Sequence, residues 1–147
     1  MNTTTVATVA SFAAVLVTFL AAHQVADYWV QTHHQAGTKG GPGWTGRLAC
    51  ARHVATYTAT LVVMLGAVVW VTGLSVSLTG LVVGQLVSAV THYFADRRTP
   101  LHALACAVGN RDFWNLGAGH LGSGAAALDQ SWHTGWLWLA ALLTVAL

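Results

Sequence analysis

The chain is 147 residues long, and 55% of its residues are hydrophobic whereas only 7% are charged. A soluble domain normally carries about 25% charged residues, so this composition excludes an ordinary water-exposed surface and indicates an outer face surrounded by lipid. The net charge of +2 is small and the basic residues are scattered, which excludes a nucleic-acid-binding surface. We therefore predict a single integral membrane domain over residues 1–147, with membrane lipid around it.

Four hydrophobic segments predict membrane-spanning helices, because a helix needs about 20 mostly apolar residues to cross a bilayer. They cover approximately residues 6–31, 48–71, 74–96 and 129–147. No basic residue precedes the first apolar stretch, so we expect a retained helix there rather than a signal peptide. The Gly-rich segment THHQAGTKGGPGWTGR predicts a loop between the first and second helices.

The long segment between the third and fourth predicted spans has a helix pattern of its own. Thr99 is suited to the N-cap, Pro100 to the first helical position and Gly109 to the position just past the end. We expect a short interfacial helix here, followed by the Gly/Ala-rich connector RDFWNLGAGHLGSGAAA. The predicted fold class is all-α: a polytopic membrane four-helix bundle with a short interfacial helix between the third and fourth spans.

The basic residues all fall in or beside the loops that follow the first and third predicted spans. They are Lys39, Arg47, Arg52, Arg97, Arg98 and Arg111. Basic loops stay on the cytoplasmic side of a membrane. This distribution therefore predicts that both loops are cytoplasmic and that both termini lie outside.

Histidine and aspartate recur at a spacing of four residues. The pairs are His23 with Asp27, His92 with Asp96, and Asp129 with His133. Residues four apart in a helix share one face, and random placement would give only about 0.4 such pairs in a chain of this composition. The pattern therefore indicates a built polar cluster.

The predicted topology brings every pair to the cytoplasmic end of the bundle, together with His53 near the start of the second span. Imidazole and carboxylate are ligands that Zn, Fe and Mn accept, and helical bundles build metal sites from such pairs on facing helices. The predicted metal ligands are His23, Asp27, His53, His92, Asp96, Asp129 and His133. We expect one or two divalent transition-metal ions, Zn first and Fe or Mn as alternatives, and we assign catalytic roles to Asp96 and His133.

Polar and basic residues surround the same end of the predicted bundle. The candidate substrate-binding residues are Gln31, Lys39, Arg52, Arg97 and Arg98. Guanidinium and ammonium groups at the headgroup level bind phosphate, so the expected substrate is an anionic lipid or a phosphoester. No Ser or Cys nucleophile stands out, which favours direct attack by water.

These residues predict a metal-dependent hydrolase that acts at the cytoplasmic membrane surface. Two alternatives stay open. The same carboxylates and imidazoles could belong to an ion or proton transporter, or to a non-catalytic protein whose His/Asp network only holds the helices together. Whether the chain forms a homo-oligomer also stays open.

Several of these motifs, in this order, resemble an uncharacterised family of small bacterial integral membrane proteins, a domain of unknown function. The motifs are AAHQVADYWVQT, Lys39, ARHVATY, THYFADR and ALDQSWH. That family is similar in plan to the membrane-bound metal-dependent hydrolases. The resemblance extends from the first helix to the last, outside the connector 97–128, and implies a location in the bacterial inner membrane. The polar positions it implies are His23, Asp27, Gln31, His53, His92, Asp96, Asp129 and His133.

Overall fold

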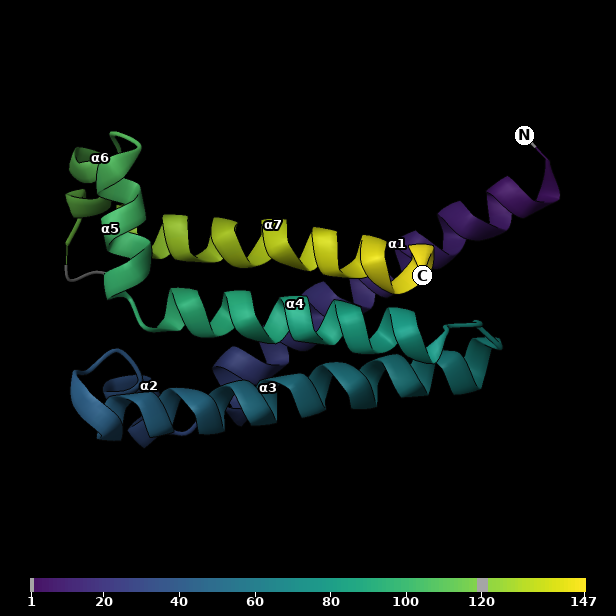
Figure 1. The fold of residues 1–147 in the computed structure, drawn as a ribbon, viewed down its shortest axis with the longest axis horizontal. Helices are drawn as coiled ribbons and strands as arrows, with labels where there is room; N and C mark the ends of the chain where they lie inside the picture. The colour runs from purple at the N-terminus through teal and green to yellow at the C-terminus, as the bar shows by residue number, and fades with distance from the viewer. Residues whose placement is uncertain (1, 119–121) are drawn as a thin grey trace.

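The computed structural model describes residues 2–118 and 122–147, and these residues form helices joined by short turns (Figure 1). A π-helical turn, η1, continues the first helix. In chain order the elements are α1 (Thr3–Val25), η1 (Ala26–Val30), α2 (His33–Thr38), α3 (Gly43–Thr72), α4 (Leu78–Asp96), α5 (Thr99–Ala107), α6 (Arg111–Asn115) and α7 (Gly124–Ala146).

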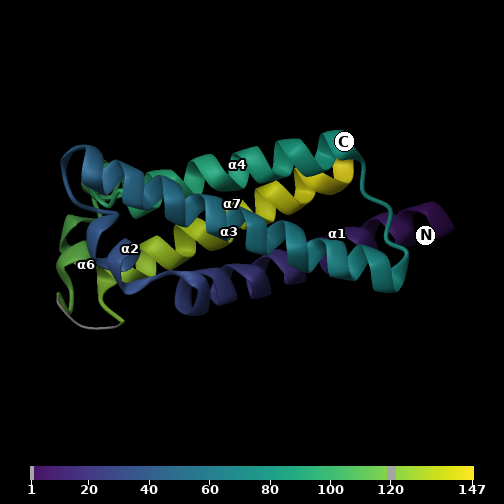
Figure 2. The same ribbon diagram turned by 90° about the horizontal axis from the view of Figure 1, so that it is seen from below.

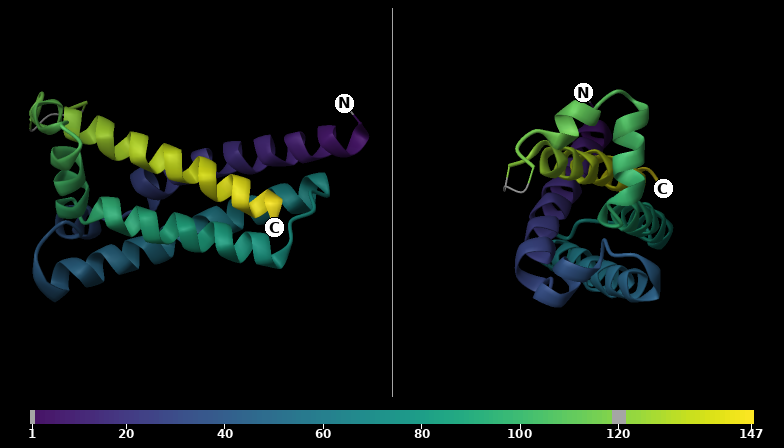
Figure 3. Two further views of the ribbon diagram at one scale, coloured as in Figure 1. Left: turned by 45° about the horizontal axis from the view of Figure 1, so that its top comes forward. Right: turned by 90° about the vertical axis from the view of Figure 1, so that its left-hand side faces the viewer.

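The four long helices, α1, α3, α4 and α7, run alternately up and down in one bundle (Figures 1 and 2). Helices α1 and α4 each pack against both α3 and α7, so α1 and α4 face each other across the bundle. The short helices α2, α5 and α6 gather at one end, which faces the viewer in the right-hand panel of Figure 3. Helix α1 begins and α7 ends at the opposite end.

Three helical segments are long and apolar enough to cross a membrane: Thr3–Val30, Gly43–Thr72 and Leu78–Asp96. They contain most of the first three predicted spans, which supports the prediction of a membrane protein. Residues 129–146 of the fourth predicted span lie within α7, which is not one of these three segments.

The loop predicted before the second span is mostly helical, so that prediction was wrong. Thr32 and Gln35 form a capping box that starts α2: Gln35 N–H donates to Thr32 Oγ1 at 3.2 Å, and Thr32 N–H donates to Gln35 Oε1 at 2.8 Å. Helix α3 then begins at Gly43, directly after Pro42. The capping side chains supply the partners that a helix start needs, which outweighs the unfavourable helix propensity of the glycines.

The short helix expected after the third span is present as α5, and it lies across the end of the bundle (Figure 1). Its N-cap is Arg98, with a positive φ of 58°, rather than Thr99 as predicted. The Gly/Ala-rich connector expected after it contains a further short helix, α6. Residues 119–121 of that connector lie outside the described residues.

Two glycines of α4, Gly80 and Gly84, lie directly against α7. A Cβ on Gly84 would overlap Thr144 Oγ1 and Ala140 O, and a Cβ on Gly80 would overlap Thr144 O. Small residues spaced four apart allow this approach and the van der Waals packing that holds helices together in lipid. The apolar core beside this contact includes Leu137 and Ala141 of α7.

We therefore expect Gly84→Val to destabilise the bundle by about 1–3 kcal/mol, because the added methyl groups have to force α4 away from α7. Gly66→Val is the matched control, since a Cβ on Gly66 meets nothing within 4 Å. Thermal unfolding in detergent measures both. Equal unfolding midpoints for the two variants would show that the α4–α7 approach does not matter.

Candidate functional site

The seven predicted metal ligands lie together at the bundle end that carries α2, α5 and α6. The buried members of the cluster are His23, His53, His92, Asp96 and His133. Asp27 and Asp129 are partly buried. Every long helix contributes at least one of these side chains, so the cluster occupies the space between all four.

Ligand atoms in this cluster converge within 4.8 Å of one another in three overlapping groups. The groups are His23, Asp27 and His92; His53, His92 and Asp96; and Asp96, Asp129 and His133. These buried His/Asp groups could hold a metal ion.

Four ligand atoms, from α3, α4 and η1, lie closest together. His53 Nε2 and His92 Nε2 are 3.0 Å apart. Asp96 Oδ2 is 3.3 Å from His53 Nε2 and 3.2 Å from His92 Nε2. Asp27 Oδ1 is 3.3 Å from His53 Nε2 and 3.6 Å from His92 Nε2. We call Asp27, His53, His92 and Asp96 the tetrad.

Three of these ligand atoms, His53 Nε2, His92 Nε2 and Asp96 Oδ2, lie within 3.3 Å of one another, which suits the ligands of one metal ion. Four N and O ligands at about 2.0–2.1 Å from one tetrahedral ion lie roughly 3.3 Å from each other. His53 Nε2 and His92 Nε2 are within hydrogen-bonding distance of each other, whereas Asp27 Oδ1 and Asp96 Oδ2 have no hydrogen-bond partner of good geometry among the described residues. Asp27 Oδ1 lies near both imidazoles as well, so the tetrad offers donor atoms of the kinds that hold a metal ion.

The charges around the tetrad also favour a cation. Lys39 Nζ lies 2.7 Å from Asp96 Oδ1, and both side chains are about nine-tenths buried. This ammonium balances one carboxylate and leaves Asp27 and Asp129 to be balanced. An uncompensated carboxylate is costly in a buried site, and a divalent ion removes that cost.

Arg97 holds the turn that carries Lys39. Its guanidinium donates to Lys39 O at 2.5 Å and to Gly41 O at 2.7 Å. Arg97 follows α4 directly, so the same helix end positions both Asp96 and its Lys39 partner. The substrate-binding role predicted for Arg97 stays a prediction, and the observed role of its guanidinium is to position this turn.

The π-helical turn η1 positions Asp27 and Gln31. Gln31 N–H donates to Ala26 O, five residues back, at 2.9 Å. Such a wide turn adds one residue to the helix and re-aims the side chains near it. Asp27 keeps a 3.6 Å contact with His23 Nδ1, and Gln31 ends the turn with its amide nitrogen buried.

Asp129 and His133 of α7 form a second, more open part of the cluster. His133 Nδ1 lies 2.8 Å from Asp129 O and has to donate to it, because a carbonyl can only accept. The lone pair of His133 Nε2 is therefore free, and no described residue bonds it. The Asp129 side chain is 31% exposed, against 4% for Asp96.

A cavity of about 720 Å³ lies beside the cluster. Lys39, Asp96 and Asp129 line one side, and Arg98, Trp114 and Ser123 line the rest together with neighbouring small residues. The connector between α4 and α7 therefore forms much of the cavity wall. Arg98, one of the predicted substrate-binding residues, is on this cavity. Arg52 is not among its lining residues and lines a smaller cavity with His34 and Trp44.

Two residues that contact the cluster were not predicted from the sequence. The Tyr57 ring stacks on His92 with 3.8 Å between ring centroids. Gln130 Oε1 lies 3.3 Å from His23 Nε2, and Gln130 Nε2 donates to Asp129 Oδ2 at 3.2 Å. Tyr57 follows His53 by four residues, so the spacing that revealed the His–Asp pairs could have revealed it as well.

No protein-family model, no curated protein and no solved structure matches this chain.

We expect purified protein to retain at least one divalent ion, measured by elemental analysis for Zn, Fe, Mn, Co and Ni. His53→Ala and His92→Ala should each weaken retention by more than the roughly 10–100-fold that loss of an outer-shell partner costs. His33→Ala is the matched control, because His33 is exposed and outside the cluster. Absence of stoichiometric metal from the wild type, including after reconstitution, would contradict this prediction.

Proposed function

We propose that this protein is an integral membrane metal-dependent hydrolase that acts on an anionic lipid or phosphoester at the cytoplasmic surface of the bacterial inner membrane. The observation that carries the proposal is the tetrad beside a cavity lined by Lys39, Arg98 and Asp129. The donor set of two imidazoles and two carboxylates suits Zn first, with Fe or Mn as alternatives. A second ion would use the free donors of Asp129 and His133.

The proposed chemistry assigns separate roles to residues of the cluster and to residues that line the cavity beside it. The tetrad residues would hold a divalent ion, which would supply Lewis-acid chemistry and a water of lowered pKa. The free Nε2 of His133 would accept a proton from water as the water oxygen forms a bond to phosphorus and the P–O bond to the leaving group breaks. The same imidazolium would then give this proton to the leaving oxygen, and Asp129 faces the cavity nearby. Asp96 is a ligand whose second oxygen is fixed by Lys39. Arg98 attracts the anionic group of the substrate.

Asp96→Asn should lower turnover of phosphatidylglycerol or a soluble phosphoester by at least about 10²-fold, because it weakens the tetrad and removes the partner of Lys39. Asp112→Asn, the same change on an exposed residue of α6, is the control and should leave turnover unchanged. Both are measured in nanodiscs with added metal, after unfolding midpoints confirm that each variant is folded. Equal turnover by the two variants would contradict the assigned role of Asp96.

A transporter of ions or protons is the second candidate, and one observation favours it. Polar groups continue from His92 toward the middle of the bundle: Tyr57 stacks on His92, and Tyr57 Oη lies 2.8 Å from Ser88 Oγ. Gln85, one turn further along α4, is buried, and its amide has no partner among the described residues. Metal or proton flux in proteoliposomes without hydrolysis would select this candidate. Loss of stability alone in Asp96→Asn would select a structural network.

We further propose that α7 is a fourth span and that both termini lie outside. Its 23 residues extend about 34 Å, enough for a hydrocarbon core of about 30 Å. The basic residues lie at the end with α2 and α5, which the positive-inside rule assigns to the cytoplasm.

In a background without native cysteines, Ser75→Cys should therefore react with a membrane-impermeant maleimide on intact cells, because Ser75 is exposed in the turn between α3 and α4. Thr45→Cys, which is exposed at the basic end, should react only after permeabilisation. The reverse pattern would invert the orientation.

A further inference from the structure

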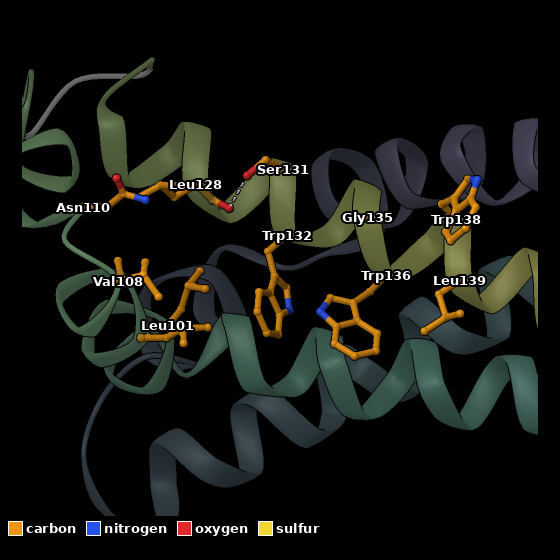
Figure 4. Close-up of a pocket in the computed structure, with 12 residues that line it drawn as sticks. Leu101, Val108, Asn110, Leu128, Ser131, Trp132, Gly135, Trp136, Trp138 and Leu139 are labelled. Atoms are coloured by element: carbon orange, nitrogen blue, oxygen red, sulfur yellow. Dashed lines mark hydrogen bonds between the residues drawn. The ribbon is translucent and has the colours of Figure 1, made fainter.

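An apolar groove of about 460 Å³ lies on the outer face of the bundle, between α5 and α7 (Figure 4). Leu101 and Val108 lie at the α5 end, and Trp132, Trp136 and Leu139 follow along α7. The volume is in the range of small-molecule sites. The groove is separate from the polar cavity and uses none of the tetrad residues.

Trp132 forms a fixed wall of this groove. Its Nε1–H donates to Thr91 O at 3.0 Å, and its ring stacks on Phe94 with 5.1 Å between centroids. The indole N–H therefore has a hydrogen-bond partner on α4, and the ring is held in place. A preformed apolar site of this kind accepts a flexible chain without having to reorganise.

We propose that this groove binds one acyl chain of an anionic phospholipid from the adjacent leaflet. At about 1.5 Å per residue, Leu128 to Leu139 extends roughly 16 Å along α7. One leaflet contributes half of a hydrocarbon core that is about 30 Å thick. The groove therefore has the length of one leaflet's chain. A spanning helix of a partner would need a contact about twice as long.

The position of the groove relative to the polar cavity indicates where the head group lies. Leu128 lines the groove, and the next residue, Asp129, lines the cavity that also contains Lys39 and Arg98. Helix α5 crosses the bundle at this same end (Figure 1). A lipid chain in the groove places its head at the cavity mouth, where Arg98 attracts an anionic group.

For the proposed hydrolase, this makes the substrate a membrane phospholipid held by one chain while its head group reaches the tetrad. That step rests on the proposed function, whereas binding of the chain does not. A soluble phosphoester would reach the cavity without using the groove.

Gly135 is a position from which a side chain can be added to the groove. It lines the groove, and a Cβ there meets nothing within 4 Å. Gly66, on the exposed face of α3, is equally open and serves as the matched control. Gly135→Trp puts an indole where the chain would lie, and Gly66→Trp adds the same group elsewhere.

The test uses the full chain in phosphatidylcholine nanodiscs that contain phosphatidylglycerol with a diazirine in one acyl chain. After illumination, labelled peptides should be enriched at residues 101–108 and 128–139 over the exposed face of α3 around Val63. Gly135→Trp should reduce labelling of the groove roughly tenfold, because several buried methylenes lose their contacts, and Gly66→Trp should not.

Three results would overturn the inference: uniform labelling of α3 and the groove, groove labelling unchanged in Gly135→Trp, or cross-links between two copies of the chain through the groove. Turnover separates the two proposals. Groove labelling without hydrolysis leaves the lipid site standing and removes the hydrolase. If phosphatidylglycerol is hydrolysed with the same KM by Gly135→Trp and wild type, the hydrolase stands and the groove is not its chain site.

Discussion

The structure depends on the burial of carboxylates at one end of an apolar bundle. Asp27 and Asp96 converge on the imidazoles of His53 and His92 in a region where an unbalanced charge is costly. Lys39 balances only one of them. The π-helical turn and the Arg97 contacts hold the carboxylates and imidazoles in place. A bound cation would balance the negative charge that remains there.

The cluster of His and Asp side chains draws on all four long helices, and the tetrad on three of them. The tetrad joins α1, through η1, to α4 across the bundle, while α3 supplies His53 between them. At the other end, Gly80 and Gly84 let α4 and α7 approach until their backbones touch. The bundle thus uses small-residue contacts at one end and polar contacts between helices at the other. Both kinds of contact hold helices together in lipid.

Helix α7 has a polar face and, next to it, an apolar face. One face presents His133 to the cluster and Asp129 to both the cluster and the polar cavity. The other face presents Trp132 and Trp136 to the apolar groove. The connector covers the end where these faces meet, with α5 beside the groove and α6 near the cavity. A molecule with a charged head and an apolar tail fits this division, whereas a small soluble ion would use only the polar face.

Much of this arrangement follows from local properties of the sequence. Residues four apart share a helix face, so each His–Asp pair was predictable, and the length of apolar segments predicted the long helices. The capping box at Thr32 is also local, and the glycines after it led to the wrong prediction of a loop. Contacts between residues far apart in the chain were decided only by the tertiary structure. Lys39 meets Asp96, and Tyr57 stacks on His92, because α3 and α4 pack together with the turn before α3 folded against them. Helical periodicity specifies which face a side chain occupies, but packing between helices determines which atom it meets.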